Sequence, residues 1–346
     1  MEAKVLWGKI ELKPGVIGKI TILQDTNLYQ IKDDKLYKVR KVKKGQEFRV
    51  YFDRYRQGVG RLYGLGTGIY VPQSSAVKYE TVPQTMMEQL KREQRKTSIS
   101  PEQYIKNTGY NISYYYENLI TGDKFAYGGT KVYRVASTIK LPLALYVYKL
   151  AAENKINLEE KLTYKRHHYY GGSGVIQKAK VGTKYTIRDL VKKSMVHSDN
   201  IAFIMLKEKV GANNFVHYMR GLGGKVTYPN GKNMTTAEDL VKYAKAAYQF
   251  EKQSPELGRE LVYYLKHTDY QKTIPAGVPK LEVAHKVGYI PMELIYNDVG
   301  IVYDVQPYVL AIMTTGIPYN KEEKIIAELT KIIHQNHVSR YQLNVK

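Results

Sequence analysis

Cysteine is missing from this 346-residue sequence. Its absence excludes disulfide bonds, thiolate nucleophiles and zinc sites built on sulfur ligands. Tryptophan occurs once and phenylalanine six times, so tyrosine, with 33 residues, supplies most of the aromatic surface. No apolar run reaches the roughly 18 residues of a membrane-spanning helix, which excludes an integral membrane domain.

Acidic residues are scarce relative to basic ones: 32 Asp and Glu stand against 54 Lys and Arg, for a net charge of +22. Such a field attracts polyanions, including nucleic acid, anionic lipid and anionic cell-wall polymers. The sequence has no zinc-finger spacing, helix-turn-helix pattern or RNP-like motif, so specific nucleic-acid recognition is not expected. We expect solvated charge with a weak attraction for polyanions, among which cell-wall polymers would suit it.

Metal and phosphate sites also lack their usual patterns. The eight histidines contain no H-E-x-x-H spacing, and the adjacent His167 and His168 are expected to point apart, so no metal site is predicted. The glycine-rich segment 171–174 is not followed by the Lys-Ser/Thr pair of a phosphate loop. We therefore expect no metal and no cofactor. The segment around Tyr169 and Tyr170 is instead expected to line a cleft.

The N-terminus, Met-Glu-Ala-Lys, has no charged segment followed by an apolar segment, so no signal peptide is recognisable. Two interpretations stay open at this point: the protein is cytoplasmic, or a leader has been removed from an exported protein. The absence of cysteine fits both interpretations.

Residues 1–82 have the pattern of a small all-β domain. Short alternating segments, such as Lys19–Leu23 and Glu47–Phe52, are separated by turns that contain Gly and Asp. Residues 83–100 change to a polar, helix-permissive run, which predicts a linker helix. We therefore expect a small all-β domain, a linker helix and one larger domain over residues 101–346.

The larger domain mixes strands and helices in a particular order. A β-hairpin is predicted at 111–127, a mainly helical stretch at 138–250, and three strands between 283 and 315. A last amphipathic helix is predicted over 321–334. Strands at both ends with helices between them indicate an α/β (α+β) fold, with one antiparallel sheet flanked by helices and an all-helical lobe.

Three short motifs occur in one order along this larger domain. The first, Ser137–Lys140, is an S-x-x-K; the second, Ser198–Asn200, is an S-D-N; the third, Lys286–Gly288, is a K-x-G on a predicted strand. Each motif alone is weak, because such short patterns occur by chance in proteins of this length. Their order and their predicted structural contexts together point to one catalytic site.

The first motif has a physical reason to be reactive. Ser137 is placed at the start of a helix, and residues three apart lie on the same helix face, so the Lys140 amine can reach the Ser137 hydroxyl. Free N–H groups and the positive end of the helix dipole can hold an oxyanion there and lower the pKa of Lys140. A lysine whose pKa lies near neutrality can act as the base that activates a serine.

Residues from about 100 to 346 resemble the serine β-lactamase and penicillin-binding protein superfamily, and are most similar to class A β-lactamases. The segments that carry the resemblance are VASTIKLPLALYVYKL, GTKYTIRDLVKKSMVHSDNIA and AHKVGYI. The resemblance implies a two-lobe fold with the active site between the lobes. Residues 1–82 resemble a bacterial SH3-like barrel of the kind found on exported wall-associated proteins, with a structural spacer as the alternative.

The resemblance also implies a role for each motif residue. Ser137 would be the nucleophile, Lys140 the acylation base or proton relay, and Ser198 the group that passes a proton to the leaving nitrogen. Lys286 would supply positive potential near the substrate. The backbone N–H groups of Ser137 and Tyr289 would form the oxyanion hole. The residues implied in substrate binding are Asn200, Val287, Gly288 and Tyr289.

The sequence departs from the class A pattern at two places. The glutamate that activates the deacylating water has no counterpart, because no Asp or Glu occurs between Lys209 and Ala237. Glu238 follows, but the spacing Thr235-x-x-Glu238 is typical of a capping box. Without that carboxylate, an acyl-enzyme is expected to persist. Val287 replaces a hydroxyl-bearing residue of the family, so β-lactams are expected to bind more weakly.

These features predict an exported serine hydrolase that forms an acyl-enzyme on Ser137 with a β-lactam or a D-Ala-D-Ala-type peptide of peptidoglycan and deacylates slowly. Two alternatives stay open: a penicillin-binding sensor that is acylated stoichiometrically, and a non-catalytic cell-wall-binding protein that keeps the fold. The net charge of +22 suits an extracellular position at the anionic wall of a Gram-positive-type bacterium.

Overall fold

A computed structural model of the chain describes residues 5–32, 35–66, 68–97 and 99–341. Within these residues the chain divides into two compact units. The first comprises everything up to Ser100 together with the end of the chain from Ile332, and the second comprises Pro101–Lys331. No described helix combines the length and the apolar character that crossing a membrane requires.

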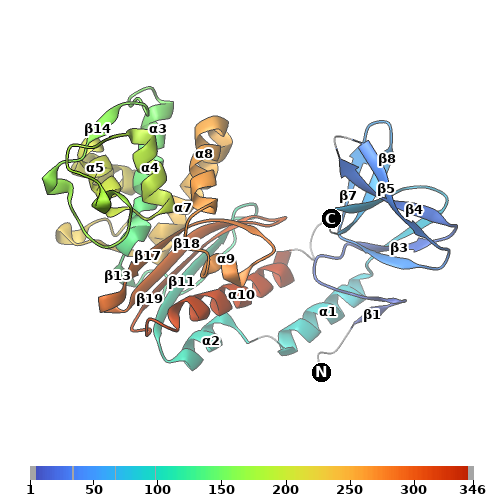
Figure 1. Cartoon of the computed structure of the whole chain (residues 1–346). Helices are drawn as coiled ribbons and strands as arrows, with labels where there is room; N and C mark the ends of the chain where they lie inside the picture. The colour runs from blue at the N-terminus through green and yellow to red at the C-terminus, as the bar shows by residue number, and fades with distance from the viewer. Residues whose placement is uncertain (1–4, 33–34, 67, 98, 342–346) are drawn as a thin grey trace. The chain divides into compact units, whose positions relative to one another are not determined.

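The first unit consists mainly of short strands (Figure 1, in blue). They form a five-stranded sheet of order β5-β4-β9-β8-β7, a three-stranded sheet of order β10-β3-β6 and the pair β1-β2. Apolar side chains of both larger sheets, such as Ile20 and Val71, share one core. The strands are Leu6–Trp7 (β1), Ile10–Glu11 (β2), Gly18–Ile22 (β3), Thr26–Lys32 (β4), Lys35–Val42 (β5), Glu47–Val50 (β6), Phe52–Arg56 (β7), Gly60–Gly66 (β8), Ile69–Pro72 (β9) and Val77–Thr81 (β10).

These strands confirm a small all-β region at the start of the chain, while the SH3-like resemblance stays a prediction. Helix α1 (Gln84–Thr97) follows at the position where the sequence predicts a linker helix. Its Leu90 packs against Val5, Leu12 and Val16. Because α1 buries an apolar residue in this way, it contributes to the core of the first unit instead of being only a spacer.

The second unit is built on a five-stranded antiparallel sheet of order β12-β11-β19-β18-β17. Strands from both ends of the unit pair in it, as predicted. Nearly all residues of β18 and β19 are buried, because helices cover both faces of the sheet. The strands are Asn111–Asn118 (β11), Lys124–Tyr127 (β12), Glu282–Ile290 (β17), Ile295–Tyr303 (β18) and Tyr308–Thr315 (β19).

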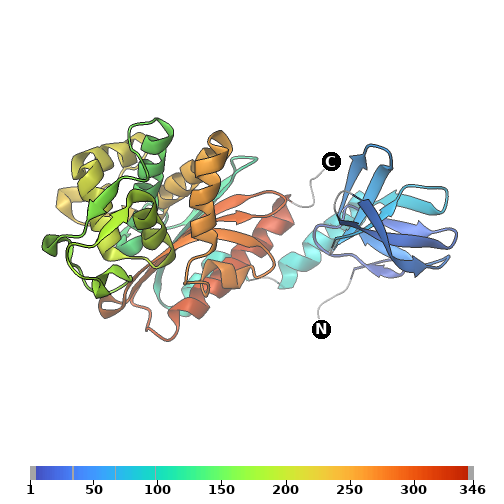
Figure 2. The ribbon, with the colours of Figure 1, turned by 45° about the horizontal axis from the view of Figure 1, so that its top comes forward.

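Helices lie on both faces of this sheet (Figures 1 and 2). Helices α2, α9 and α10 cover one face, whereas α7 packs across β11, β18 and β19 on the other and joins the helical lobe. The helices are Pro101–Thr108 (α2), Lys140–Ala152 (α3), Ile187–Val196 (α4), Asn200–Val210 (α5), Ala212–Gly221 (α6), Ala237–Gln253 (α7), Pro255–Lys266 (α8), Ile274–Gly277 (α9) and Glu322–Tyr341 (α10).

Short elements connect the sheet with the helical lobe. Two small sheets join β13 to β16 and β14 to β15, and single turns of 3₁₀ helix interrupt the loops. Their bounds are Val132–Arg134 (β13), Lys161–Thr163 (β14), Lys184–Thr186 (β15), Met234–Thr236 (β16), Ala136–Ile139 (η1), Arg166–His168 (η2), Ile176–Lys178 (η3), Pro229–Gly231 (η4) and Pro291–Glu293 (η5). The mixed α/β architecture predicted from the sequence is therefore confirmed.

A buried asparagine ties the start of η1 to the sheet. The Nδ2 atom of Asn297, on β18, donates to the carbonyl oxygens of Arg134 at 2.8 Å and Val135 at 3.2 Å. Its Oδ1 accepts from the Thr314 backbone N–H at 3.1 Å. The nitrogen and the oxygen of this amide thus both bond to backbone groups, which holds the chain where it enters η1.

Replacing this asparagine should destabilise the second unit. We expect Asn297→Ala to lower the free energy of unfolding by about 3 kcal/mol, because it leaves buried backbone groups without partners. Urea titration followed by near-UV circular dichroism measures the effect. Trp7, the single tryptophan, lies in the first unit, so its fluorescence transition should stay unchanged. A shift of both transitions, or of neither, would contradict this account.

Candidate active site

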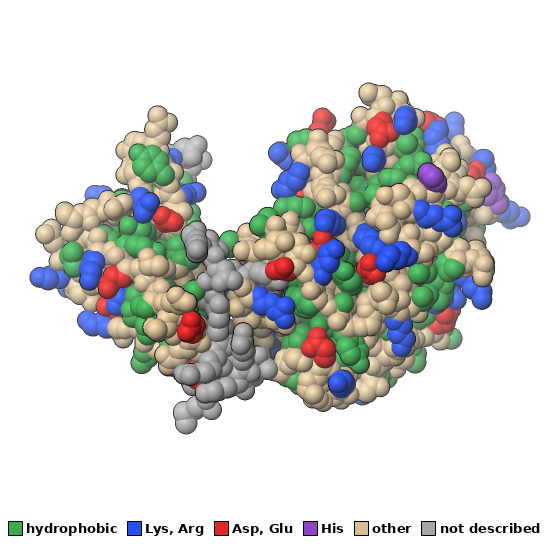
Figure 3. Space-filling view, turned by 180° about the vertical axis from the view of Figure 1, so that it is seen from behind, with side chains coloured by type: hydrophobic (Ala, Val, Ile, Leu, Met, Phe, Trp, Pro, Cys, Tyr) green, Lys and Arg blue, Asp and Glu red, His purple; other side chains and the backbone are tan. Residues whose placement is uncertain are grey.

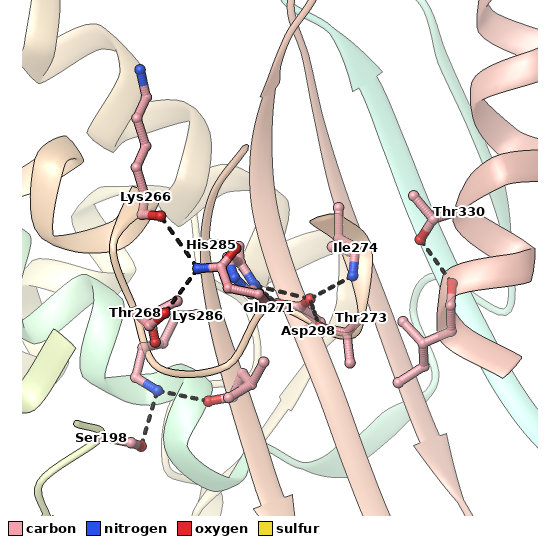
Figure 4. Close-up of polar contacts among 12 residues, drawn as sticks. Ser198, Lys266, Thr268, Gln271, Thr273, Ile274, His285, Lys286, Asp298 and Thr330 are labelled. Atoms are coloured by element: carbon pink, nitrogen blue, oxygen red, sulfur yellow. Dashed lines mark hydrogen bonds and ion pairs between the residues drawn. The ribbon is translucent and has the colours of Figure 1, made fainter. Parts of the chain in front are cut away.

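The three motifs predicted from the sequence meet at the junction of η1 and α3. Ser137 lies on η1, and Lys140 is the first residue of α3, one turn further along. The Lys140 Nζ atom lies 2.9 Å from Ser137 Oγ. Lys286, on β17, reaches the same place from the sheet, and its Nζ donates to Ser198 Oγ at 2.9 Å (Figure 4).

The contacts of the Lys140 amine fit a base. Two of its neighbours can only accept hydrogen bonds: the carbonyl oxygen of Ser198, at 2.5 Å, and Oδ1 of Asn200, at 2.7 Å. A neutral amine has two N–H donors and one lone pair. If the donors serve these two acceptors, the lone pair is left for the Ser137 hydroxyl. Ser198 Oγ lies somewhat further away, at 3.2 Å.

Burial sets the electrostatics of both lysines. Lys140 is 2% exposed and Lys286 is 0% exposed. Loss of hydration lowers the pKa of Lys140 well below its ordinary value, and the nearby charge of Lys286 lowers it further, whereas Asp199 acts in the opposite direction. Burial lowers the pKa of Lys286 to about 7, and Asp298 partly opposes this shift. Lys286 can therefore lose its proton near neutral pH, and Lys140 loses its proton more easily than an ordinary exposed lysine.

The turn between α4 and α5 presents Ser198 and Asn200 to the site, and Ser198 is in a strained conformation. Ser198 has a φ of +53°, in the left-handed region that side-chain-bearing residues rarely adopt. Asp199 stabilises this turn: Oδ1 caps α5 by accepting from the Ala202 N–H at 2.9 Å. Its Oδ2 accepts from the N–H groups of Val175 and Ile176. The sequence motif contained this aspartate, but its neighbours across the fold were not predictable.

The glycine-rich segment 171–174 packs directly against this turn. Ser173 Oγ donates to the Ser198 carbonyl oxygen at 2.6 Å, and Asn200 Nδ2 donates to the Gly171 carbonyl oxygen at 3.0 Å. A Cβ at Gly174 would lie 2.4 Å from Asp199 Cγ, so only glycine permits this approach. Ser173 is a polar residue of the site that motif analysis missed, because no recognisable spacing links it to Ser198.

Strand β17 brings its backbone against η1. A Cβ at Gly288 would lie 2.8 Å from the backbone nitrogens of Ser137 and Thr138. Gly288 therefore permits the strand to pass directly beside the serine turn. The Val287 side chain is 1% exposed, and this residue meets the site through its carbonyl oxygen, which accepts from Lys286 Nζ at 2.9 Å.

The placement of Tyr289 follows from the same strand. Backbone groups of residues two apart point to the same side of a strand, so the Tyr289 N–H lies on the side of the Val287 carbonyl. Strand β17 is at the edge of its described sheet, which leaves one row of its backbone groups without a neighbouring strand. The predicted site residues Ser137, Lys140, Ser198, Asn200, Lys286, Val287, Gly288 and Tyr289 thus come together around η1, Lys140 and β17.

The strand residue next to Lys286 points to the opposite face. His285 is buried, and its Nδ1 lies 3.0 Å from Asp298 Oδ1 (Figure 4). Asp298 Oδ2 also accepts from the Thr273 hydroxyl and the Ile274 N–H. These bonds and His285 lower the pKa of Asp298, although its burial acts in the opposite direction. The network fixes the strand segment that carries Lys286 from behind.

The predicted cap at Thr235 is wrong by one residue. Thr236 caps α7, because its Oγ1 accepts from the Asp239 N–H at 3.1 Å. Glu238 instead pairs with Lys242 at 3.1 Å and Lys225 at 3.6 Å. Among the described residues, no carboxylate makes a hydrogen bond with the four catalytic candidates Ser137, Lys140, Ser198 and Lys286.

The adjacent histidines do not point apart as predicted. His167 Nε2 and His168 Nε2 lie 2.8 and 2.9 Å from the same oxygen of Glu208. Three such groups could hold a metal ion, but His168 Nδ1 accepts from the Lys165 N–H at 3.0 Å. The neutral ring then carries its proton on Nε2, where a metal would have to bind. The arrangement therefore fits a hydrogen bond from His168 to Glu208 better than a metal site.

Comparison with known proteins also relates the larger unit to beta-lactamases. A family model described as the beta-lactamase enzyme family matches residues 93–337. A beta-lactamase from Bacillus licheniformis is 29% identical over 235 residues, which cover 62% of this chain and 75% of that protein. Beta-lactamase 3 from Bacillus cereus is 28% identical over 234 residues, covering 62% and 72%.

Solved structures are similar over the same part of the chain. A mutant of PBP-A, solved as an acyl-enzyme complex with penicillin G, has a TM-score of 0.62 at 25% identity and covers 74% of this chain and 97% of its own. A beta-lactamase from Sphaerobacter thermophilus has a TM-score of 0.60 at 24% identity and covers 67% and 93%. The second likeness supports the fold.

Burial of the two lysines predicts how stability depends on pH. Their pKa values are lower in the folded protein than in the unfolded chain, which therefore binds more protons above pH 7. Stability should rise with pH, by about 2 kcal/mol between pH 7 and 9 for Lys286 alone. Lys286→Met should flatten this rise in urea titrations at the two pH values. Exposed Lys280→Met is the matched control and should leave the slope intact; equal slopes in all three proteins would disprove this assignment.

Proposed function

Because the chain belongs to the beta-lactamase enzyme family, we propose that its larger unit is a serine hydrolase that forms an acyl-enzyme on Ser137. Its substrate is a β-lactam or a D-Ala-D-Ala-type peptide of peptidoglycan. The observation that carries this proposal is the buried Lys140 amine, 2.9 Å from Ser137 Oγ. The PBP-A relative, solved with penicillin G as an acyl-enzyme, supports the substrate class.

Acylation begins with transfer of the hydroxyl proton of Ser137 to the lone pair of Lys140 Nζ. The Oγ attacks the carbonyl carbon of the substrate, and the C–N bond of the amide or lactam then breaks. Lys140 passes the proton to Ser198, 3.2 Å away, whose own proton goes to the leaving nitrogen. The proton of Ser137 is thus replaced by the acyl group, and Lys140 returns to its neutral form.

Lys286 and the backbone assist this step electrostatically. The charge of Lys286 lies beside Ser198 Oγ, at 2.9 Å, and lowers the pKa of Lys140. The N–H groups of Ser137 and Tyr289 form the oxyanion hole, and removal of one such donor typically costs on the order of 10²–10³ in rate. Asn200 binds the substrate amide and also positions Lys140 through Oδ1, while Val287 and Gly288 line the strand edge beside the substrate.

Deacylation is the slow half of the reaction in this proposal. An ester on Ser137 is hydrolysed when a base removes a proton from an attacking water. No carboxylate is hydrogen-bonded to the site among the described residues, and Glu238 is held by Lys225 and Lys242. The acyl-enzyme therefore accumulates, and Val287, which lacks a hydroxyl for the substrate carboxylate, weakens the binding of β-lactams.

A penicillin-binding sensor is the second candidate function. In the described ranges of the chain, no carboxylate is a hydrogen-bond partner of Ser137 or Lys140. This favours a sensor, because a long-lived acyl group can report the presence of a β-lactam. A non-catalytic wall-binding protein is the weaker alternative, since nothing in it requires a buried amine beside Ser137. Stable labelling of Ser137 separates the first two candidates from the third.

We also assign the protein to the outside of the cell, at the wall or membrane of a Gram-positive-type bacterium. Peptidoglycan peptides occur there, and the net charge of +22 suits anionic wall polymers. In the same proposal residues 1–82 form an SH3-like domain that places the enzyme at the wall, followed by the connecting segment 83–100 and the catalytic domain 101–346.

Covalent labelling tests the nucleophile. Fluorescent penicillin should label the wild-type protein with one stable group per chain on a denaturing gel, and Ser137→Ala should abolish the label because it removes the attacking oxygen. Ser194→Ala, which alters another buried serine of the same unit, should label like the wild type. Label that persists in Ser137→Ala would refute the proposed nucleophile.

Turnover of a chromogenic cephalosporin tests the missing carboxylate. We expect a burst of about one product per chain, followed by a steady rate at least 10²-fold slower than the burst, because no base activates water. Stopped-flow absorbance measures both phases. Rapid multiple turnover without a burst would mean that another group performs deacylation. The proposed slow deacylation would then be wrong.

A further inference from the structure

A cavity lies in the helical lobe, away from Ser137. It has a volume of about 720 Å³ and lies between α6 and the segment that contains η4. Cavities of this size accommodate small molecules in other proteins. None of the contacts around Ser137 described above involves a residue that lines this cavity.

The side chains with basic groups that line the cavity are Lys207, His217 and Arg220, and no Asp or Glu is among its described lining residues. Lys and Arg side chains are scattered over the face drawn in Figure 3, some of them beside acidic ones, so cations alone do not indicate a binding site. Among the described residues, none of these three forms an ion pair with a carboxylate, and all three line the same cavity. An anion entering the cavity would therefore meet cations that are not already neutralised.

The arrangement of two of these cations leaves donors available. Lys207 Nζ lies 5.7 Å from the ring centroid of Tyr228 and 5.6 Å from that of Phe203, so aromatic faces are its described neighbours. Arg220 uses Nε to donate to Thr227 Oγ1 at 3.0 Å. Its two terminal nitrogens have no described hydrogen bond and can form the forked contact that carboxylates and phosphates prefer.

The remaining walls of the cavity combine the polar side chains of Asn213 and Asn214 with the apolar or aromatic side chains of Ala212, Phe215, Val216 and Tyr228. Phe215 is fully buried, and Tyr228 and Val216 are half-buried. The Phe215 and Tyr228 rings meet edge to face, with centroids 6.4 Å apart. Tyr228 is held with a φ of +47°, a conformation that a bulky residue keeps only when its surroundings fix it. A ligand with an apolar or aromatic body can pack against the half-buried side chains of Val216 and Tyr228.

We propose that this cavity is a binding site for a small molecule that carries a phosphate or carboxylate on an apolar or aromatic body. Lys207 and Arg220 bind the anion, and Val216 and Tyr228 contact the body. The site does not depend on the chemistry assigned to Ser137, so it stands or falls separately from the proposed hydrolase.

Three probes separate the two halves of the ligand: phenyl phosphate, inorganic phosphate and phenol. Binding to the full chain is measured by calorimetric titration. Phenyl phosphate should bind more tightly than inorganic phosphate, because it adds apolar contact, and phenol should not bind measurably. If inorganic phosphate binds as well as phenyl phosphate, the apolar half of the proposal is wrong.

Charge removal locates the site. Lys207→Gln/Arg220→Gln should weaken phenyl phosphate binding roughly tenfold or more, and each single variant should give a smaller loss. Lys161→Gln/Lys184→Gln removes the same charge from exposed residues of β14 and β15 and should bind like the wild type. Equal weakening in both double variants, unchanged binding in Lys207→Gln/Arg220→Gln, or no binding to the wild type at millimolar concentration would overturn the proposal.

Discussion

The catalytic unit depends on two buried lysine amines, those of Lys140 and Lys286, that lie beside one hydroxyl. Lys140 and Lys286 both lie within hydrogen-bonding distance of Ser198 Oγ, and neither has a carboxylate as a hydrogen-bond partner within the part of the chain that the structure describes. Burying a charge in this way is unfavourable, and the proteins that tolerate it usually gain chemistry from it. Here burial favours the neutral form of Lys140, whose lone pair is then available to accept the proton of Ser137.

The polar contacts around the site serve to keep this unfavourable arrangement in place. Asp199 holds the left-handed turn at Ser198, Asn297 holds the chain that enters η1, and Gly288 lets β17 lie against it. Asp199 and Asn297 come from different elements of the fold, and the side chains of both form hydrogen bonds with backbone groups. The helical lobe and the sheet are thus joined where the reactive atoms lie. The surrounding contacts hold the two buried amines in position although their burial is unfavourable.

Local patterns predicted the strands, the helices and the pairing of Ser137 with Lys140, because all of these depend on residues close in sequence. They did not predict Ser173 or Asn297, whose partners lie far along the chain and have no characteristic spacing. The cap of α7 was misplaced because two neighbouring threonines, Thr235 and Thr236, each precede an acidic residue by three positions. Only packing decides between two such registers.

The short pair β13–β16 has a consequence for how such a protein could change its chemistry during evolution. The Val135 N–H donates to the Asn233 carbonyl oxygen at 3.0 Å, and Val132–Arg134 pairs with Met234–Thr236. A longer loop that delivered a hydrolytic carboxylate would have to preserve this register, since slippage would move the approach to Ser137. New residues are therefore tolerated only upstream of Asn233, and the path from a persistent acyl-enzyme to a fast hydrolase is confined to one short stretch.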